Sequence, residues 1–415
     1  MDESNDKLDW ALTFLIGFGF FTTGITWSVY NSYVPPMLEE IIKNSPSWYA
    51  LIGTWMKTFI GIIMVLDNIA AITLQPWIGA RSDKTWTRFG RRMPYIMIGI
   101  PLAAIFFSII PTINDLLLII GIITLFNVSM AIYRAPVVAL MPDLIPSKHR
   151  SRANGVINLM GGIGAIYAFF VGSHIYEYYG RLATFATTSV LMILALAILI
   201  LKIREKKEMA ELAEKEKVNI INAFKEVLSN PDKSGLFILF AILFWFFSYN
   251  VIETWFTLYG ENVLGVPDYI ASRALTIFAL TFVIFAVPAG YLADRIGRRN
   301  TIIIGIAGLI FVLIVSALVN SITILSYILG LGGIFWAMIN INSITIVWEI
   351  AGNVKLGAYT GLYYFFSQFA AIAGPVIAGM IFDLVGINIM FWLSTIYLII
   401  ALVCMFGVKS GEVKK

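Results

Sequence analysis

Long apolar runs separated by short polar breaks fill the chain from residue 10 to residue 407. A helix needs about 20 apolar residues to cross the roughly 30 Å hydrocarbon core of a bilayer, and each run has about that length or more. The pattern therefore predicts an all-α integral membrane protein with twelve transmembrane helices. The expected spans are 10–36, 50–79, 93–111, 115–141, 154–176, 183–202, 235–260, 270–293, 300–319, 322–349, 357–384 and 388–407.

Composition agrees with this class. Hydrophobic residues make up 59% of the chain and charged residues 13%, whereas soluble proteins carry roughly 45–50% and about 25%. Too few charges remain to cover a water-exposed surface, which excludes a soluble enzyme. The apolar fraction is too high for disorder, and the absence of a 3.5-residue repeat excludes a coiled coil. Cys404 is the single cysteine, so neither an intramolecular disulfide nor a thiolate metal site is expected. No cofactor and no nucleic-acid partner are expected.

The basic residues set the expected orientation. Most of the 29 Lys and Arg lie in alternate loops and at the two chain ends, and only Lys43, Arg181 and Arg273 fall in the opposite loops. Because cytoplasmic loops are enriched in Lys and Arg, we expect a cell-membrane protein with both termini in the cytoplasm. Residues 1–9 are acidic and the first apolar run is too long for a signal peptide, so no cleaved segment is expected.

One long polar stretch divides the chain. We expect a six-helix bundle in 1–202, a cytoplasmic linker in 203–234, a second six-helix bundle in 235–407 and a tail in 408–415. The second part of the linker has apolar residues at helical spacing, which predicts an amphipathic helix lying on the inner membrane surface. These residues are Ile220, Ile221, Phe224, Val227 and Leu228.

The loops after the second and eighth predicted helices share one pattern. Gly79-x-x-x-Asp83 precedes Gly90-Arg-Arg, and Gly290-x-x-x-Asp294 precedes Gly297-Arg-Arg. Parallel halves with the same loop are typical of alternating-access transporters, here as two pseudo-symmetric bundles. The Gly-rich stretches 161–164 and 374–379 are expected to allow close helix packing.

This repeated loop resembles the signature of the major facilitator superfamily. Within it, the stretch from Gln75-Pro76 to Met93-Pro94 resembles the sucrose-type sugar transporters, and Ala139 to Gly155 resembles both these and the melibiose-type glycoside–cation symporters. Melibiose-type carriers have an acid just before the proline of helix 2. Gln75 occupies that position here, which favours protons as the coupling ion.

The resemblance implies a cytoplasmic gate in which Asp83 meets the start of helix 11 near Gly357, and Asp294 meets the start of helix 5 near Asn154. Carboxylates suit this role because a helix N-terminus offers unpaired N–H groups and positive partial charge. The alternative is that the arginines only fix topology. The expected gating residues are Asp83, Arg88, Arg91, Arg92, Asp143, Arg150, Asp294, Arg295 and Arg298.

Charged residues inside the predicted helices are candidates for coupling, because burying them in hydrocarbon is costly. Asp67 and Arg134 lie at similar depths, about 18 and 14 Å from the cytoplasmic ends at 1.5 Å per residue. They form either a proton switch or a permanent ion pair. Glu253 could bind a sugar hydroxyl, carry the proton or stabilise an outer gate. Lys57 is expected to extend to the surface, and Glu349, Asp383 and His174 to be solvated at helix ends.

A sugar site needs amide or carboxylate groups beside an aromatic plane. Helices 1, 4, 7 and 10 carry such combinations, and by the repeat geometry these helices line the cavity. Ordinary buried packing is the alternative for any one of the aromatic residues. The expected substrate-binding residues are Trp27, Asn31, Asn127, Tyr133, Trp245, Tyr249, Asn250, Glu253, Trp336 and Asn340.

Together these features predict a monomeric carrier that moves a sugar or glycoside inward with a proton, and not an enzyme. An exporter or uniporter of another organic solute, such as a drug or an organic anion, is the alternative of the same fold. A channel would lack the paired gate loops. A membrane enzyme would need a cluster of His, Cys or carboxylate residues at the interface, and the sequence has no such cluster.

Overall fold

A computed structural model describes residues 8–146, 149–205, 220–229, 231–351 and 356–409. Among these residues, eleven continuous helical segments are long and apolar enough to cross a membrane. The longest, Arg152–Lys202, contains two crossings, because its backbone leaves the helical region at Gly180 (φ 82°, ψ 174°). Glycine suits this turn because it adopts positive φ without a Cβ penalty. The predicted all-α fold with twelve transmembrane helices is therefore confirmed.

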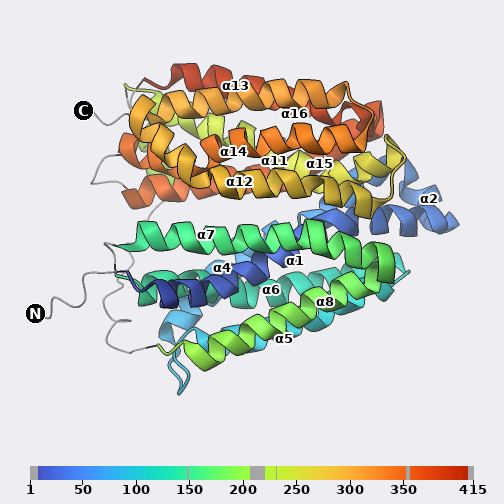
Figure 1. Cartoon of the computed structure of the whole chain (residues 1–415), viewed down its shortest axis with the longest axis horizontal. Helices are drawn as coiled ribbons and strands as arrows, with labels where there is room; N and C mark the ends of the chain where they lie inside the picture. Colours follow the sequence, from blue (N-terminus) through green and yellow to red (C-terminus); the bar gives the residue numbers. More distant parts are fainter. Residues whose placement is uncertain (1–7, 147–148, 206–219, 230, 352–355, 410–415) are drawn as a thin grey trace, which may run out of the picture. The chain divides into compact units, whose positions relative to one another are not determined.

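Contacts divide the chain into two compact units. Unit 1 comprises residues 1–37 and 66–215. In it α5 packs against α6 and α8, and α4 packs against α6 (Figure 1). Its elements are α1 (Trp10–Asn44) as far as Met37, α4 (Leu66–Lys84), α5 (Met93–Ile109), α6 (Leu116–Leu144), α7 (Arg150–Ile166), the π-helical turn η5 (Tyr167–Gly172) and α8 (Ser173–Lys202).

Unit 2 comprises residues 38–65 and 216–415. Its largest helix contacts join α12 to α14, α13 to α14, and α11 to both α15 and α16. Its elements are α2 (Pro46–Ile52), the 3₁₀ turn η2 (Gly53–Trp55), α3 (Met56–Met64), α10 (Ile220–Ser229), α11 (Ser234–Asn262), α12 (Asp268–Ile296), α13 (Arg298–Ala317), α14 (Ile322–Ala351), α15 (Leu356–Val385) and α16 (Met390–Gly407).

Residues 38–65 group with unit 2 by their contacts. The second predicted span lies within one helical segment, Pro46–Lys84, whose α-helix is interrupted by η2 and by a turn at Val65. The partner of this stretch is α15. α3 packs on α15, and a Cβ on Gly379 would lie 2.6 Å from the Lys57 carbonyl oxygen, which shows how close the two backbones are.

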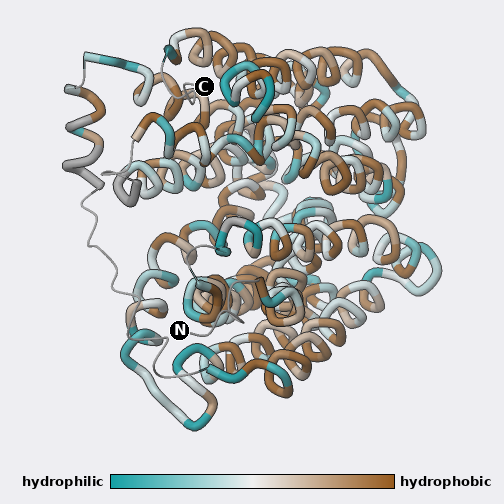
Figure 2. Tube along the Cα trace, turned by 60° about the vertical axis from the view of Figure 1, so that its left-hand side comes forward, coloured by the Kyte–Doolittle hydropathy of each residue, from teal (hydrophilic) through white to brown (hydrophobic). Residues whose placement is uncertain are grey.

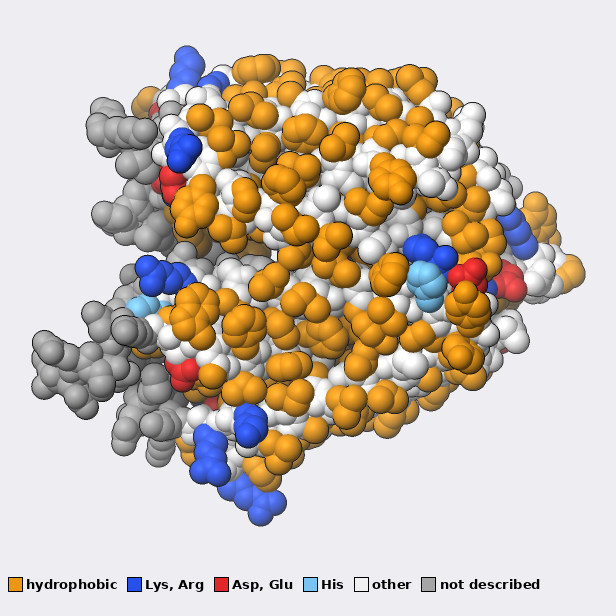
Figure 3. Space-filling model, in the orientation of Figure 1, with side chains coloured by type: hydrophobic (Ala, Val, Ile, Leu, Met, Phe, Trp, Pro, Cys, Tyr) orange, Lys and Arg blue, Asp and Glu red, His pale blue; other side chains and the backbone are white. Residues whose placement is uncertain are grey.

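The surfaces of both units are apolar along the helices. Figure 2 shows hydrophobic residues over most of the helical lengths and hydrophilic ones at the connections. In Figure 3 hydrophobic side chains cover the middle of the visible face, while Lys, Arg, Asp and Glu lie toward helix ends. In water such a surface would drive aggregation, whereas in a bilayer these side chains contact lipid.

The predicted amphipathic helix of the linker forms α10. The ring of Phe224 lies 5.9 Å from that of Phe366 in α15, and Val227 is buried. One apolar edge of α10 therefore packs on its own unit. The side chains of Ile220 and Ile221 and the first part of the linker lie outside the described residues, so placement on the inner membrane surface stays a prediction.

Candidate functional site

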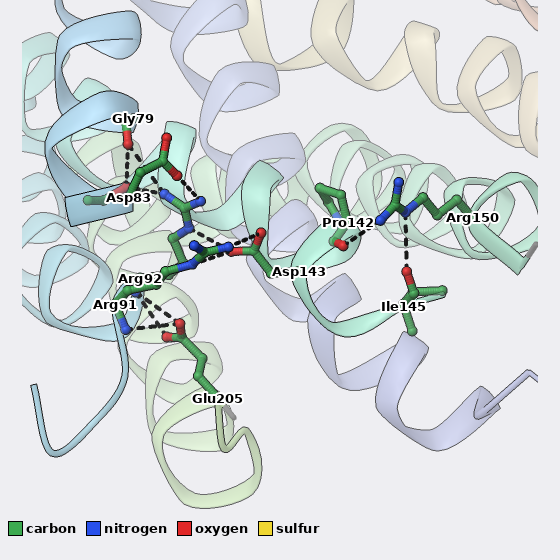
Figure 4. A network of polar contacts seen from close by, with 10 residues as sticks. Gly79, Asp83, Arg91, Arg92, Pro142, Asp143, Ile145, Arg150 and Glu205 are labelled. Atoms are coloured by element: carbon green, nitrogen blue, oxygen red, sulfur yellow. Dashed lines mark hydrogen bonds and ion pairs between the residues drawn. The ribbon is translucent and has the colours of Figure 1, made fainter. Parts of the chain in front are cut away.

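The loop between α4 and α5 carries Arg91 and Arg92, which connect polar side chains from several elements (Figure 4). We call this set the arginine network: Ser82, Asp83, Arg91, Arg92, Asp143 and Glu205. Asp143, near the end of α6, accepts from Arg91 Nη2 at 2.6 Å and from Arg92 Nε at 2.7 Å. Arg92 also contacts Asp83 and the Ser82 hydroxyl. The side chains of both arginines and of Asp143 are less than one-tenth exposed. Asp143 therefore pairs with two buried cations, and Asp83 gives Arg92 a second carboxylate.

Arg92 is held in its charged form by this arrangement. Burial by itself would lower its pKa, but the hydrogen bonds and charges of Asp143 and Asp83 offset that effect and raise the pKa above its ordinary value. Arg92 therefore stays charged within the network.

Glu205 anchors the network from outside the loop, and sequence reasoning missed it. Its carboxylate accepts from the backbone N–H groups of Arg91 at 3.0 Å, Arg92 at 3.0 Å and Met93 at 2.9 Å. These groups lie at the start of α5, where N–H groups lack helical partners and favour negative charge. A Cβ on Gly90 (φ 107°) would lie 2.5 Å from the Glu205 carboxyl carbon. The sequence around Glu205 reads only as a mixed-charge run.

The other expected gating residues of unit 1 lie around this network. Arg88 stands over the ring of Phe89 at 4.7 Å. Arg150 donates to the carbonyls of Pro142 at 2.8 Å and Ile145 at 3.2 Å, so it satisfies free carbonyls at the end of α6. The expected meetings of Asp83 with Gly357 and of Asp294 with Asn154 join different units, and both stay predictions.

Unit 2 repeats the network in reduced form. Arg298, at the start of α13, forms an ion pair with Glu349 near the end of α14. Arg299 donates instead to the Phe406 carbonyl at 3.3 Å. Asp294 and Arg295 are exposed, and Asp294 lies within electrostatic range of Arg298. The expectation that Glu349 is only solvated at a helix end is wrong, because its side chain is 17% exposed and paired.

Unit 1 places several predicted substrate residues in one aromatic and polar cluster. The ring of Trp27 lies 5.5 Å from Tyr30 and 5.9 Å from Phe126. Trp27 Nε1 is buried without a hydrogen-bond partner among the described residues. The buried Tyr30 hydroxyl lies beside the Asn127 amide, and the buried Tyr133 hydroxyl lies beside Thr22 and Thr23; none of these atoms has a further partner in the described part of the chain. Asn31 follows Trp27 by one helical turn and is half-buried. Buried polar groups normally have partners, so this cluster can receive water or a ligand.

The two candidate coupling groups of unit 1 have different neighbours. Arg134 lies over the Trp27 ring at 6.0 Å, while Asp67 accepts from Asn68 Nδ2 at 2.8 Å and lies within electrostatic range of Tyr30. Between these two described residues the structure shows no ion pair. A permanent Asp67–Arg134 pair, one of the two sequence readings, is therefore not seen. The coupling role stays a prediction.

In unit 2 the rings of Tyr249 and Trp336 stack at 4.5 Å and 7°, and the Tyr249 hydroxyl donates to Glu253 Oε1 at 3.2 Å. An aromatic plane thus lies beside a carboxylate inside the membrane spans. Trp245 is fully buried, and its Nε1 has no partner among the described residues. Asn250 donates back to the Phe246 carbonyl at 2.7 Å.

The two asparagines of α14 differ. Asn342 is buried, and its amide donates to the carbonyls of Met338 at 2.9 Å and Ala289 at 3.4 Å. Asn340, the predicted substrate residue, is half-buried, and its backbone carbonyl accepts from Ser343 Oγ at 2.7 Å. Asn342 is therefore a packing residue, which leaves Asn340 as the candidate.

The far ends of the spans hold a second buried charge cluster in unit 2. Lys57 pairs with Glu39, and Glu39 also accepts from Lys43 at 2.5 Å and from Asn262 at 3.2 Å. The side chain of Lys57 is 12% exposed. The expectation that Lys57 extends to the surface is therefore wrong, because Glu39 provides a partner inside the fold.

Asp383 caps the start of α3. It accepts from the backbone N–H of Lys57 at 2.8 Å, from the backbone N–H of Thr58 at 2.7 Å and from the Thr58 hydroxyl at 2.6 Å. It was expected to be merely solvated, and this is wrong. His174 was expected to be solvated at a helix end. It lies near the junction of η5 and α8, and its Nδ1 is 2.7 Å from the Phe170 carbonyl oxygen. Among the described residues, no group of three His, Cys, Asp or Glu could hold a metal ion.

Helices of this length, a repeated charged loop and buried polar residues within the spans together define a multi-pass membrane transporter. The sequence model of the Major Facilitator Superfamily matches residues 16–272 and 268–415, so the chain belongs to this superfamily. The narrower resemblance to sucrose-type and melibiose-type carriers is not confirmed.

Individual relatives are more distant. The inner membrane transport protein YajR of Escherichia coli strain K12 is 30% identical over 145 residues, which is 34% of this chain and 30% of that protein. A point mutant of the nucleoside transporter NupG shares the fold at 15% identity, with a TM-score of 0.72 over 96% of this chain and 98% of that one. A bacterial homolog of the human lysosomal transporter Spinster, inward-facing and occupied, gives 13% identity, a TM-score of 0.73 and coverage of 95% and 96%.

Proposed function

We propose that this chain is a proton-coupled symporter of a sugar or glycoside. It acts as a monomer in the cell membrane, with both termini in the cytoplasm, and moves its solute inward. Transport occurs by alternating access between the six-helix halves 1–202 and 235–407, which the linker 203–234 joins. The repeated loop and the superfamily match support this class of mechanism.

The observation that carries the substrate class is the set of Tyr249, Trp336 and Glu253. A stacked aromatic pair with a carboxylate at its edge suits a solute that has C–H faces and hydroxyl edges. In unit 1 the indole of Trp27 and the amide of Asn127 provide the same chemistry. We assign Asn31, Tyr133, Trp245, Asn250 and Asn340 to the same solute pathway, because they lie on the same helices.

Proton coupling is assigned to Asp67 and Glu253, the two acids inside the spans beside the substrate residues. Each lies near a tyrosine hydroxyl, Tyr30 and Tyr249 respectively. A carboxyl group in such a site gains or loses a proton as its surroundings change, which links protonation to the state of the carrier. Arg134 competes with the proton for Asp67 when the two come together.

The experiment is uptake into proteoliposomes with an imposed pH gradient, using Asp67→Asn and Glu253→Gln. A symporter that loses its proton carrier should lose uphill accumulation but keep substrate exchange, which needs no net proton movement. Asp115→Asn is the matched control, because Asp115 caps α6 at a helix end and asparagine caps equally well. Unimpaired accumulation in both variants would mean that coupling uses another group or that the protein is a uniporter or an exporter.

A further inference from the structure

Arg134 is a cation within the span Leu116–Leu144. Among the described residues no acidic side chain forms an ion pair with it, and its neighbour is the ring of Trp27 at 6.0 Å. A contact with a ring face offsets only part of the cost of a charge at this depth. The guanidinium therefore has hydrogen-bonding capacity that no described carboxylate uses.

The polar atoms around Trp27, the ring beside Arg134, point to the partner. Trp27 Nε1 is buried without a hydrogen-bond partner among the described residues, and the buried Tyr30 hydroxyl and Asn127 amide have no partner there except each other. Tyr30 is fully buried and Asn127 is 2% exposed. The Trp27 and Tyr30 rings lie 5.5 Å apart, and Tyr30 lies beside Asn127. Because the indole and the guanidinium only donate, the cluster is rich in donors and suits an acceptor with negative charge.

We propose that Arg134, together with Trp27, Tyr30 and Asn127, binds an anionic group of the transported solute. The substrate is then a hydroxylated carboxylate rather than a neutral sugar. This inference rests on the proposed symport function and narrows its substrate class. A carboxylate accepts two parallel hydrogen bonds from a guanidinium, and hydroxyl groups of the same solute satisfy Asn127 and Tyr30.

Charge balance gives this binding mode a consequence. Among the described residues, Asp67 is the acid that lies within electrostatic range of Tyr30, and Arg134 lies within electrostatic range of Tyr133. An ionised Asp67 repels a bound anion, whereas a protonated Asp67 does not. Anion and proton therefore enter together, and one transport cycle moves no net charge. A neutral sugar carried with one proton would instead move one positive charge.

Matched solutes test the substrate charge on the unaltered protein. The probes are D-glucuronate against D-glucose and D-gluconate against D-glucitol, first by thermal shift of the purified protein and then by uptake with current recording on a supported membrane. We expect the acid of a pair to bind, with uptake driven by a pH gradient and no net current. The proposal is overturned if a neutral member binds as tightly as its acid, if no acid binds, or if uptake carries current.

Variants of Arg134 test the assigned residue. Arg134→Gln should weaken binding of the acid by about 10- to 100-fold, as expected for a lost charge-assisted pair, while Arg134→Lys retains part of it. Arg181→Gln is the control, because Arg181 also stands 6.0 Å from a ring, that of Tyr176, but lies at the turn beside Gly180. Equal losses in both variants would refute the assignment. If Arg134→Gln does not fold, the current recorded with the unaltered protein still tests whether the transported solute is an anion.

Acid binding without proton-driven uptake would contradict the symport function and leave the anion site intact.

Discussion

The loops that carry the repeated motif differ in how they hold their arginines. In unit 1, Asp143 pairs with both Arg91 and Arg92, and Glu205 fixes the backbone at the start of α5. In unit 2, Glu349 pairs with Arg298 alone, and no described counterpart of Glu205 is seen among the contacts of that loop. The motif therefore determines where the basic residues lie, and residues outside the motif determine how tightly they are held.

Loop length explains the difference. α4 ends at Lys84 and α5 begins at Met93, so a stretch of loop must be ordered before the arginines can reach Asp143. α12 and α13 are separated only by Gly297 (φ 89°), which fixes Arg298 through the backbone itself. The longer loop uses Glu205 and the Thr87–Gly90 bridge for the same purpose. Matched substitutions in the two loops can therefore measure how much each set of contacts contributes.

The largest effect is expected from Asp143→Asn. It leaves two buried arginines without their shared carboxylate, which should cost about 3–5 kcal/mol of folding free energy. Glu349→Gln removes a partner from one less buried arginine and should cost clearly less. Thermal unfolding of the purified proteins in detergent measures both. Equal destabilisation would show that the two networks are equivalent, contrary to the comparison.

An intermediate effect is expected from Glu205→Ala, which removes the acceptor of three backbone N–H groups and should cost about 1–2 kcal/mol, as for loss of a helix cap. Arg204→Ala, at an exposed neighbour, is the control. A double-mutant cycle that combines Glu205→Ala with Gly90→Ala tests the contact between the two residues. A Cβ at Gly90 meets Glu205 and also strains the positive φ, so Gly90→Ala should be less harmful once Glu205 is alanine. Strict additivity would argue that Glu205 does not pack against Gly90.

The smallest effect on stability is expected from Asp83→Asn and Asp294→Asn, because both acids are at least partly exposed; each should cost less than about 1 kcal/mol. Net transport should slow nevertheless, since the proposed gate uses both acids. Single-cysteine labelling at the cytoplasmic ends of α7 and α15, in a Cys404→Ser background, should rise. Wild-type transport with unchanged labelling would exclude both acids from the gate.

Sequence reasoning located the spans because apolar length and positions of charge are local properties. It ended the first helix at residue 36, whereas α1 continues to Asn44. Pro35, Pro36 and Glu39 resemble a loop locally, but Glu39 is paired with Lys57, so the polar residues remain within the helix. The role of Asp383 at the start of α3 has no local signal, because its partners Lys57 and Thr58 lie more than 300 residues away in sequence.

The candidate site shows the same division. The aromatic and amide residues were predicted from helical spacing, and Tyr249, Glu253 and Trp336 do lie together. Helical spacing does not show which asparagine side chain donates to backbone carbonyls. Only the hydrogen bonds in the structure distinguish Asn342, which does so, from Asn340. The pairing of Asp67 with Arg134 was inferred from depth alone. Depth does not specify which way a side chain turns, and Arg134 faces Trp27 instead.

The docking of residues 38–65 on α15 has a consequence for how the protein is made. These residues leave the ribosome early, but the carboxylate that caps α3 belongs to Asp383, in the last membrane helix but one. Until that helix is made, the backbone N–H groups of Lys57 and Thr58 lack the Asp383 acceptor, whereas the side chains of Lys57 and Glu39 can already form their ion pair. Insertion of the first helices can therefore follow the order of synthesis, but their final packing cannot. The second span completes its structure only when the eleventh arrives.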